Sequence, residues 1–339
     1  SYQKLLIELM SLTPLIDLEI ERLFTYIRSF ILFNIDKIKN IPEILDIQQA
    51  LALQCFMNEY IYKENNSETE ALMSLEELIN LNISKGIQPE PFTLLCLSSY
   101  RPLYLYDWSN LISMPNEYQK TFKTLINDFF SEKKISFKIP ILKEISDDLS
   151  CEVRKQYEEN PYPKWTNTRL NRLPFTIAEI IKNLNLKLID KEINMITSPD
   201  ILIAGCGTGK HSIDIATNYK NSKILAVDLS LRSLAYAQRK TQEFNISNIK
   251  YMQADILDLE KLNKQFDIIE CGGVLHHMKD PMAGWQVLKN CLKDGGLMKI
   301  ALYSELGRQY VVKTRNEINE MGLGTSNFEI KSFRNSITK

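Results

Sequence analysis

The sequence predicts an α/β protein in which a doubly wound parallel sheet follows an all-helical domain. Glycine is unevenly distributed, since Gly86 stands alone in the first two hundred residues and the other eleven fall between Gly205 and Gly324. From about residue 199, short apolar runs alternate with helical stretches, as is typical of strands and helices in a parallel sheet. The 339 residues suffice for two domains, because a single core rarely grows beyond about 250 to 300 residues.

The first part of the chain has apolar residues at helical spacing. They recur at Leu5, Leu6, Leu9 and Met10 and through the stretch ALALQCFMNEYIY, and prolines at positions 14, 42, 89 and 91 mark breaks. We predict an all-helical accessory or substrate-recognition domain over residues 1–147. No period of thirty-odd residues is evident, so a repeat array stays open.

The second part predicts buried strands at residues 201–204, 224–227, 249–254, 266–271 and 297–303. Helices are expected at residues 231–244 and 281–292, with Ser230 and Asp280 as N-caps and the pair Gly295 and Gly296 ending the second helix. Another helix is expected at residues 308–320. This domain, residues 199–339, should be Rossmann-like.

A glycine-rich motif follows the first strand in the stretch AGCGTGKH. Gly205, Gly207 and Gly209 would let backbone N–H groups approach a ligand at the start of the next helix. A dinucleotide site would need a small residue at position 210, where this chain has a lysine, so NAD is disfavoured. Asp228 and Asp255 follow the second and third strands, so three strand ends would line one crevice.

These motifs resemble those of class I S-adenosylmethionine-dependent methyltransferases. The resemblance rests on the stretches AGCGTG, AVDLS, QADILDL, FDIIECGGVLHHMKDP and LKDGGLMKIALYS. The stretches QYEENPYPKW and LSLRSLAYAQRKT narrow it to a bacterial group often fused behind tetratricopeptide repeats, similar to rickettsial protein-lysine methyltransferases. This resemblance implies N-methylation of a protein lysine. A small-molecule methyltransferase, or a cofactor-binding scaffold whose helical domain recruits a partner, remains the alternative.

The resemblance also implies the residues that hold the cofactor, S-adenosyl-L-methionine. Its positions place the methionine portion at Gly205 and Gly207, the ribose at Asp228, the adenine at Asp255 and Ile256, and the sulfonium near Gly272 and Gly273; Cys206 and Leu229 adjoin them and complete the set. The family fold ends with an antiparallel strand pair, and too few residues follow the fifth strand to form it. We therefore expect a chain truncated at its C-terminus.

Residues 148–198 predict a helix leading into the fold and a stiff strap, since the stretch YEENPYPKW is rich in aromatics and prolines and lacks glycine. One hypothesis makes this strap an active-site lid in which Tyr157, Glu158 and Tyr162 meet a cationic group. The alternative is a packing joint with solvated glutamates. His276 is a further catalytic candidate, and the alternative is a purely structural role for its ring. His211 is expected to line the cofactor carboxylate or to cap its turn.

Bulk properties exclude several classes of protein. A formal charge of −1 gives no footprint for nucleic acid, and no apolar run approaches the roughly 18 to 20 residues of a membrane span. Six cysteines without a Cys-x-x-Cys pair and only three histidines give no metal-ligand spacing. We expect free thiols, a cytoplasmic location and a protein or small-molecule methyl acceptor, and the sequence is compatible with a homodimer.

Overall fold

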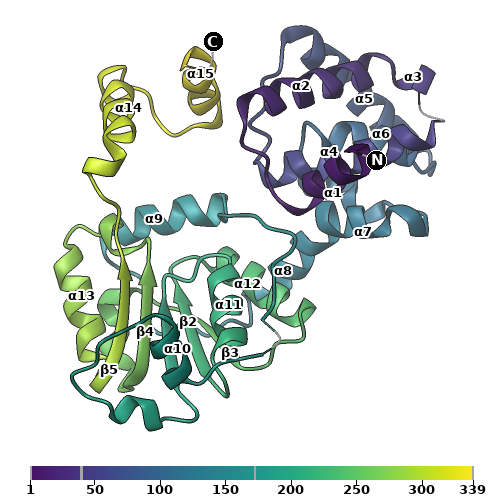
Figure 1. Ribbon diagram of the computed structural model, residues 1–339. Helices are drawn as coiled ribbons and strands as arrows, with labels where there is room; N and C mark the ends of the chain where they lie inside the picture. Colours follow the sequence, from purple (N-terminus) through teal and green to yellow (C-terminus); the bar gives the residue numbers. More distant parts are fainter. Residues whose placement is uncertain (1, 39–40, 172, 338–339) are drawn as a thin grey trace. The chain divides into compact units, whose positions relative to one another are not determined.

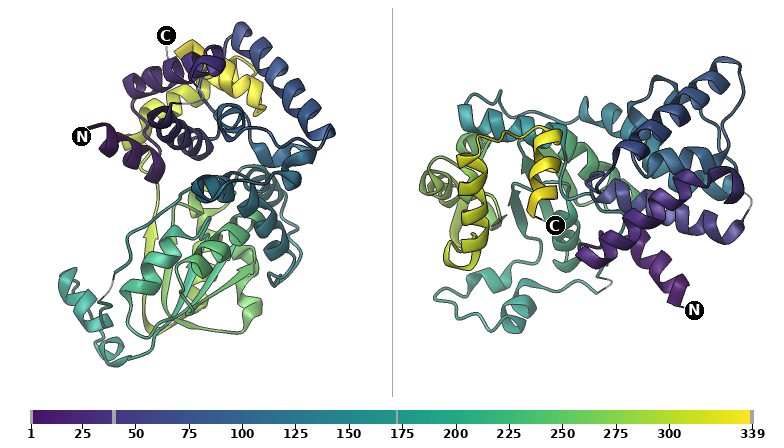
Figure 2. Two further views of the ribbon diagram at one scale, coloured as in Figure 1. Left: turned by 90° about the vertical axis from the view of Figure 1, so that its right-hand side faces the viewer. Right: turned by 90° about the horizontal axis from the view of Figure 1, so that it is seen from above.

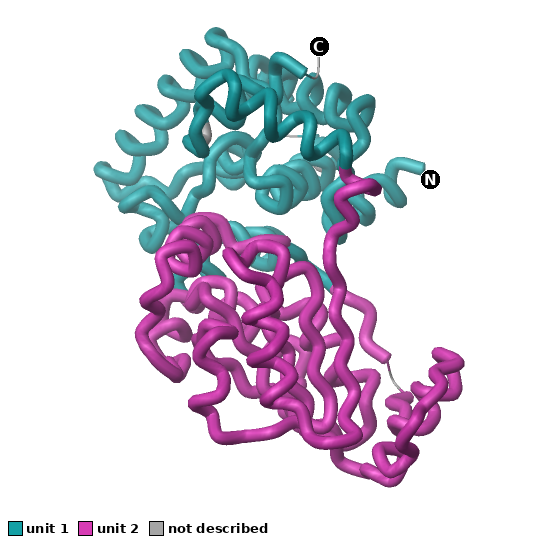
Figure 3. Tube along the Cα trace, turned by 90° about the vertical axis from the view of Figure 1, so that its left-hand side faces the viewer, with its two compact units in different colours: residues 1–130, 164–167, 309–339 teal, residues 131–163, 168–308 magenta. Residues whose placement is uncertain are grey.

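The computed structural model describes residues 2–38, 41–171 and 173–337, which divide into two compact units (Figures 1 and 3). The helical unit comprises residues 1–130, 164–167 and 309–339, and the α/β unit comprises residues 131–163 and 168–308. The predicted class, an α/β fold after a helical first part, is confirmed. Residues 131–147, which the sequence analysis grouped with the helical domain, cluster with the α/β unit.

The helical unit is built from short helices with side-chain caps. Asp17 begins the second helix by accepting from the backbone N–H groups of Glu19 and Ile20, and Asn65 with Glu68 forms a capping box. The helices are α1 (Tyr2–Leu12), α2 (Leu18–Phe33), α3 (Ile35–Ile38), α4 (Pro42–Met57), α5 (Asn66–Ser84), α6 (Pro91–Ser98), α7 (Gln119–Phe122), α14 (Gln309–Glu320) and α15 (Asn327–Ile337). Helix α14 confirms the helix expected from residue 308 onward.

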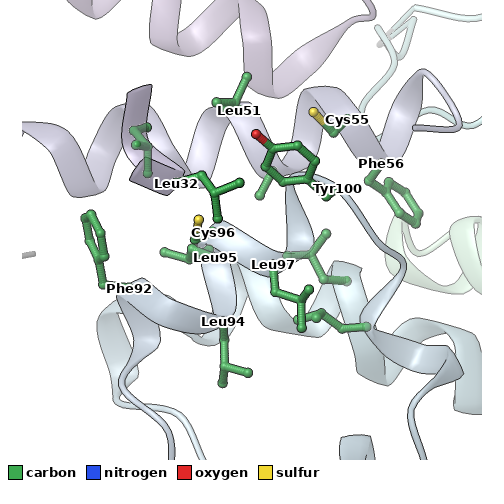
Figure 4. Close-up of a cluster of buried hydrophobic side chains, with 14 of the residues drawn as sticks. Leu32, Leu51, Cys55, Phe56, Phe92, Leu94, Leu95, Cys96, Leu97 and Tyr100 are labelled. Carbon is green, nitrogen blue, oxygen red and sulfur yellow. The ribbon is translucent and has the colours of Figure 1, made fainter. Parts of the chain in front are cut away.

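The core of the helical unit lies between α4 and α6 (Figure 4). Leu51 and Cys55 on α4 and Leu95 and Leu97 on α6 are completely buried. Burial of such side chains drives folding at roughly 25 cal/mol per Å² of apolar surface. The unit therefore has a core of its own.

The α/β unit contains a parallel sheet of five strands in the order β3-β2-β1-β4-β5 (Figures 1 and 2). The strands are β1 (Asp200–Ala204), β2 (Lys223–Asp228), β3 (Ile249–Gln253), β4 (Phe266–Gly272) and β5 (Leu292–Ala301). The first four begin and end within one residue of the predicted ranges. The order in which the chain adds strands to the sheet reverses between β1 and β4, and doubly wound sheets bind ligands at such a point.

Helices cover both faces of the sheet. Helices α11 (Lys210–Asn218) and α12 (Leu231–Glu243) follow β1 and β2, and α13 (Pro281–Asn290) precedes β5 on the opposite face (Figure 1). Leu288 of α13 packs with Ile269 and Cys271 of β4 in a buried cluster. The unit also holds α8 (Asp128–Ser136), most of which belongs here, α9 (Asp148–Glu159) and α10 (Ile177–Asn183).

One local prediction was wrong. The pair Gly295 and Gly296 does not end α13, which stops at Asn290; it lies inside β5, where the pairing with β4 shifts register. Gly295 has φ +73°, and a Cβ on Gly296 would lie 3.0 Å from the Asp267 carbonyl, so both glycines serve this irregularity. The entry helix expected within residues 148–198 is present as α9, which ends at Glu159, before the proline at residue 161.

Three further features concern the cysteines, metal sites and membrane-spanning helices. All six cysteines are free thiols. Within the described ranges, no cluster of three or more His, Cys, Asp or Glu side chains is arranged to hold a metal ion. A search of those ranges also finds no helix with the length and apolar character needed to cross a membrane.

Candidate functional site

The glycine-rich turn connects β1 to α11. Gly205, Gly207 and Gly209 have φ of +74°, +52° and +81°, a left-handed region that favours glycine. Gly205 and Cys206 donate from their backbone N–H groups to the Val227 carbonyl, which fixes the turn against β2. A Cβ on Gly205 would lie 2.3 Å from the Val274 side chain, so only glycine fits there.

Asp228, at the end of β2, is the half-buried carboxylate beside this turn. Its two oxygens accept from the backbone N–H groups of Gly207 at 2.8 Å and Ser230 at 3.0 Å. Burial raises the pKa of the Asp228 carboxyl above its ordinary value, and these backbone hydrogen bonds only partly offset the effect. A ligand that donates further hydrogen bonds would therefore stabilise the ionised form.

Asp255 occupies the corresponding place after β3. It is 5% exposed, and its side chain accepts from the Leu257 backbone N–H at 3.0 Å as the N-cap of the following turn. The backbone N–H of the preceding residue, Ala254, donates to the Asp228 carbonyl at 3.1 Å. The two acids thus belong to adjoining loops at one edge of the sheet.

A cavity of about 1310 Å³ connects these strand ends within the α/β unit. It is larger than the roughly 300 to 1,000 Å³ of ordinary small-ligand sites. It brings together every predicted cofactor residue: Gly205, Cys206, Gly207, Asp228, Leu229, Asp255, Ile256, Gly272 and Gly273. The space is therefore sufficient for a cofactor and part of a second molecule.

The predicted catalytic residues separate into two groups. Tyr157 and Tyr162 line the cavity, and burial together with the charge of Asp228 raises the pKa of Tyr157, which keeps its phenol neutral. The Glu158 side chain instead accepts from the Leu231 backbone N–H at 2.6 Å, at the start of α12. Glu158 does not line the cavity, because its carboxylate serves a helix N-terminus.

His276 also lies outside the cavity lining. Its ring packs on Tyr303 with a centroid distance of 3.9 Å and on His277 at 4.3 Å. Burial lowers the pKa of His276, and the charges of His277 and Arg308 act in the same direction. The adjoining His277 and Tyr303 do line the cavity.

Sequence reasoning missed Glu270 and Lys299, which share the cavity with His211. Glu270 is in the middle of β4 and only 4% exposed, and its carboxylate lies 2.6 Å from His211 Nε2 and 3.2 Å from Lys299 Nζ. A glutamate beside apolar residues in a predicted buried strand was the available signal, since buried acids are almost always paired. His211 therefore contacts an acid instead of only closing its turn.

Comparison with known proteins gives a match at this domain. Residues 201–296 match the protein family described as "Methyltransferase domain". The chain contains a class I S-adenosylmethionine-dependent methyltransferase domain. The predicted methyltransferase class is confirmed for this domain.

Relatives of the methyltransferase domain cover only part of the chain. An uncharacterised protein of Synechococcus sp. is 37% identical over 121 residues, 35% of this chain and 29% of that protein. A ubiquinone biosynthesis O-methyltransferase of Glaesserella parasuis is 29% identical over 163 residues, 46% of this chain and 68% of that enzyme. PKMT2 from Rickettsia typhi, solved in complex with AdoHcy, is 27% identical with a TM-score of 0.32 over 36% of this chain and 24% of that one. The chain thus spans less than a third of the Synechococcus relative's length.

The residues of the methyltransferase domain fit the cofactor of its class, S-adenosylmethionine. Asp228 has a half-buried carboxylate that additional donors would stabilise, as the hydroxyls of a ribose can. Gly273 has φ +77°, and a Cβ there would meet nothing within 4 Å, so the chain leaves open space after β4. Both features suit a ligand that crosses the strand ends from β2 to β4.

Proposed function

We propose that this chain transfers the methyl group of S-adenosylmethionine to an amine of a protein acceptor, a lysine side chain. The observation that carries the transfer itself is the Asp228 carboxylate, oriented by two backbone N–H groups at the edge of a cavity. The amine acceptor is supported by the tyrosines at this cavity, because aromatic faces attract cationic groups. The relation to rickettsial methyltransferases supports the same choice.

The chain's own residues then act mainly by alignment. Asp228 and Asp255 would hold the ribose and adenine, and the turn at Gly205 and Gly207 would approach the methionine portion. The cofactor supplies an electrophilic methyl group with a good leaving group. Alignment and exclusion of water account for most of the acceleration in such a reaction, so few acid or base groups are required.

The test of cofactor binding is calorimetric titration with S-adenosylhomocysteine. Asp228→Ala removes hydrogen bonds to a charged group, each worth about 1.5 to 3 kcal/mol, so we expect affinity to fall at least about 100-fold. Asp17→Ala is the matched control, because Asp17 also accepts from two backbone N–H groups but caps α2 in the helical unit. Equal affinities for wild type and Asp228→Ala would contradict the proposed function.

The segment of Tyr157 to Tyr162 is proposed as a cover over the reacting groups. Tyr162 is 65% exposed yet lines the cavity, and a Cβ on Gly207 would lie 3.4 Å from its carbonyl. Tyr162→Phe should lower turnover severalfold with little change in melting temperature, because the residue lines the cavity and its side chain is exposed, not part of a core. Unchanged turnover would leave this segment as a packing joint.

A small-molecule acceptor is the second candidate. The Glaesserella parasuis relative is named a ubiquinone biosynthesis O-methyltransferase, and the cavity of about 1310 Å³ has room for an aromatic alcohol beside the cofactor. Transfer of labelled methyl groups to poly-L-lysine and, separately, to 3,4-dihydroxybenzoate distinguishes the two. Methylation of the catechol alone would assign the activity to oxygen and overturn the amine acceptor.

A further inference from the structure

A charged cluster lies in the methyltransferase cavity apart from the residues assigned to the cofactor. It consists of His211 on the first turn of α11, Glu270 on β4 and Lys299 on β5, all three lining the cavity. Glu270 and Lys299 are register partners on neighbouring strands, and one carboxylate oxygen of Glu270 meets both His211 and Lys299. Three separate elements therefore converge on one buried acid.

Glu270 is maintained as a carboxylate. Burial alone would raise the pKa of Glu270, yet the hydrogen bonds and charges of His211 and Lys299 hold it below its ordinary value. An acid that stays ionised near neutral pH is a poor proton acceptor. Its contribution is to orient its neighbours and to stabilise positive charge on them.

His211 has one ring nitrogen committed and one that can react. Its Nε2 lies 2.6 Å from Glu270, so in the neutral ring Nε2 carries the hydrogen and donates it to the carboxylate. Nδ1 is then the nitrogen that can accept a proton. Because the side chain is 42% exposed and lines the cavity, a proton taken there can be returned to water.

The cluster is close to the expected point of methyl transfer. Glu270 lies two residues before Gly272 on β4, and residues at that spacing share one face of a strand, about 6.6 Å apart. Gly272 has no side chain and also lines the cavity, so nothing on β4 itself separates the two positions. An acceptor bound over Gly272 would lie within reach of the His211 ring.

We propose that His211 is the general base that deprotonates the methyl acceptor and that Glu270 is the positioning residue that holds its ring. In this step the acceptor's N–H bond breaks and a bond from hydrogen to Nδ1 forms, while the electron pair stays on the nitrogen as its lone pair. The imidazolium that results lies against the negative charge of Glu270. The role rests on the proposed methyl transfer and extends it to the acceptor's side of the cavity.

Other charged groups surround the dyad. Lys210 and Asp214 lie on the same helix as His211, Lys299 lies on β5, and Arg169 lies on the segment before α10; all four line the same cavity. Lys299 shares the Glu270 carboxylate with His211. Glu270 is therefore the residue whose substitution tests how the imidazole is held.

The first experiment follows the imidazole resonances of the full chain by NMR as a function of pH. The chain has only three histidines, so His211 is assigned by comparison with His211→Gln. In the neutral ring of wild type we expect the nitrogen shifts to place the hydrogen on Nε2, the nitrogen that contacts Glu270. In Glu270→Gln the fraction of this tautomer should fall, because a neutral amide replaces the charged acceptor. An unchanged tautomer distribution would overturn the dyad, with or without a known acceptor.

The second experiment separates base catalysis from binding. His211→Gln retains an amide N–H that can donate to Glu270 but has no nitrogen that accepts a proton. We expect turnover on the methylated probe, poly-L-lysine or 3,4-dihydroxybenzoate, to fall about 100-fold or more and to lose the ionisation of the base from its pH profile. Affinity for S-adenosylhomocysteine should stay within about threefold of wild type, since His211 is placed on the acceptor's side.

Controls distinguish the failure of this proposal from failure of the proposed function. Glu317→Gln, an exposed substitution on α14, should leave turnover and its pH profile unchanged. Retained turnover in His211→Gln would overturn the role of the base and leave methyl transfer intact. A wild-type chain that binds S-adenosylhomocysteine but methylates neither probe would overturn the proposed acceptors, and the tautomer of His211 measured by NMR would still decide whether the dyad exists.

Discussion

Both units bury acids, but the acids have different surroundings. In the helical unit Glu68 is 2% exposed, accepts from the Tyr100 hydroxyl at 2.7 Å and the Asn65 backbone N–H at 3.0 Å, and lies 3.9 Å from the buried Arg28. In the α/β unit Glu270 is 4% exposed and Asp228 is half-buried, and both border the large cavity. Burial alone therefore does not distinguish the acids of the candidate site from Glu68; their place at the wall of a cavity does.

Two glycines also differ in their surroundings between the units, and substituting them should give the largest effect on stability. Gly86 in the helical unit and Gly205 in the α/β unit have the same φ of +74°. A Cβ on Gly86 would meet nothing within 4 Å, whereas one on Gly205 would lie 2.3 Å from Val274. An alanine would thus meet the same unfavourable backbone conformation at both positions, but a steric clash only at residue 205.

We expect Gly86→Ala to lower the free energy of unfolding by about 1 to 2 kcal/mol, the cost of left-handed backbone for alanine. Gly205→Ala adds a packing clash of about 1 to 3 kcal/mol and should also weaken S-adenosylhomocysteine binding. Urea denaturation and calorimetry measure both effects. Val274→Ala in the Gly205→Ala background should recover part of the loss; if it recovers nothing, the side chain of Val274 is not what excludes a Cβ at residue 205.

The sequence allowed the sheet to be predicted better than the cavity that it carries. Apolar runs and glycine placement located β1 to β4 within a residue, because buried parallel strands require continuous apolar character. The start of β5 was missed because the pair Gly295 and Gly296 is equally typical of a helix end, and only the pairing with β4 reveals the bulge. Local signals do not distinguish these two uses of glycine.

Some residues of the candidate site could also be predicted from the sequence, and others could not. The cofactor positions implied by the family resemblance lie at strand ends in order along the chain, and all of them line the cavity. The partnership of His211 with Glu270 joins residues 59 positions apart, through the order of the strands and the facing of α11. Glu158 was assigned by its charge alone, and the Leu231 backbone N–H at the start of α12 competes for that charge. Pairings of this kind depend on tertiary structure.

A smaller effect is expected from two acids, one in each unit, whose pKa values are both lowered by their partners. Burial would raise the pKa of Glu64 in the helical unit, but hydrogen bonds from Arg101 and Thr69 and the charge of Arg101 lower it. Arg101 donates to both Glu64 oxygens at 2.7 Å. Glu270 also has a lowered pKa, through His211 and Lys299. Each carboxylate therefore contributes stability at neutral pH that is lost as pH falls below its ordinary pKa, 4.5, and through the lower folded value.

Glu64→Gln and Glu270→Gln should each flatten the acid limb of the stability curve, by at most about 1.4 kcal/mol per pH unit, the limit for one proton. Urea denaturation between about pH 3 and 7 measures this slope. Only Glu270→Gln should also change the pH profile of methyl transfer, because its partner His211 faces the cavity while Arg101 belongs to the helical unit. Equal pH profiles of turnover in the two variants would mean that Glu270, like Glu64, only stabilises the fold, and that the cavity wall gives a buried acid no special role.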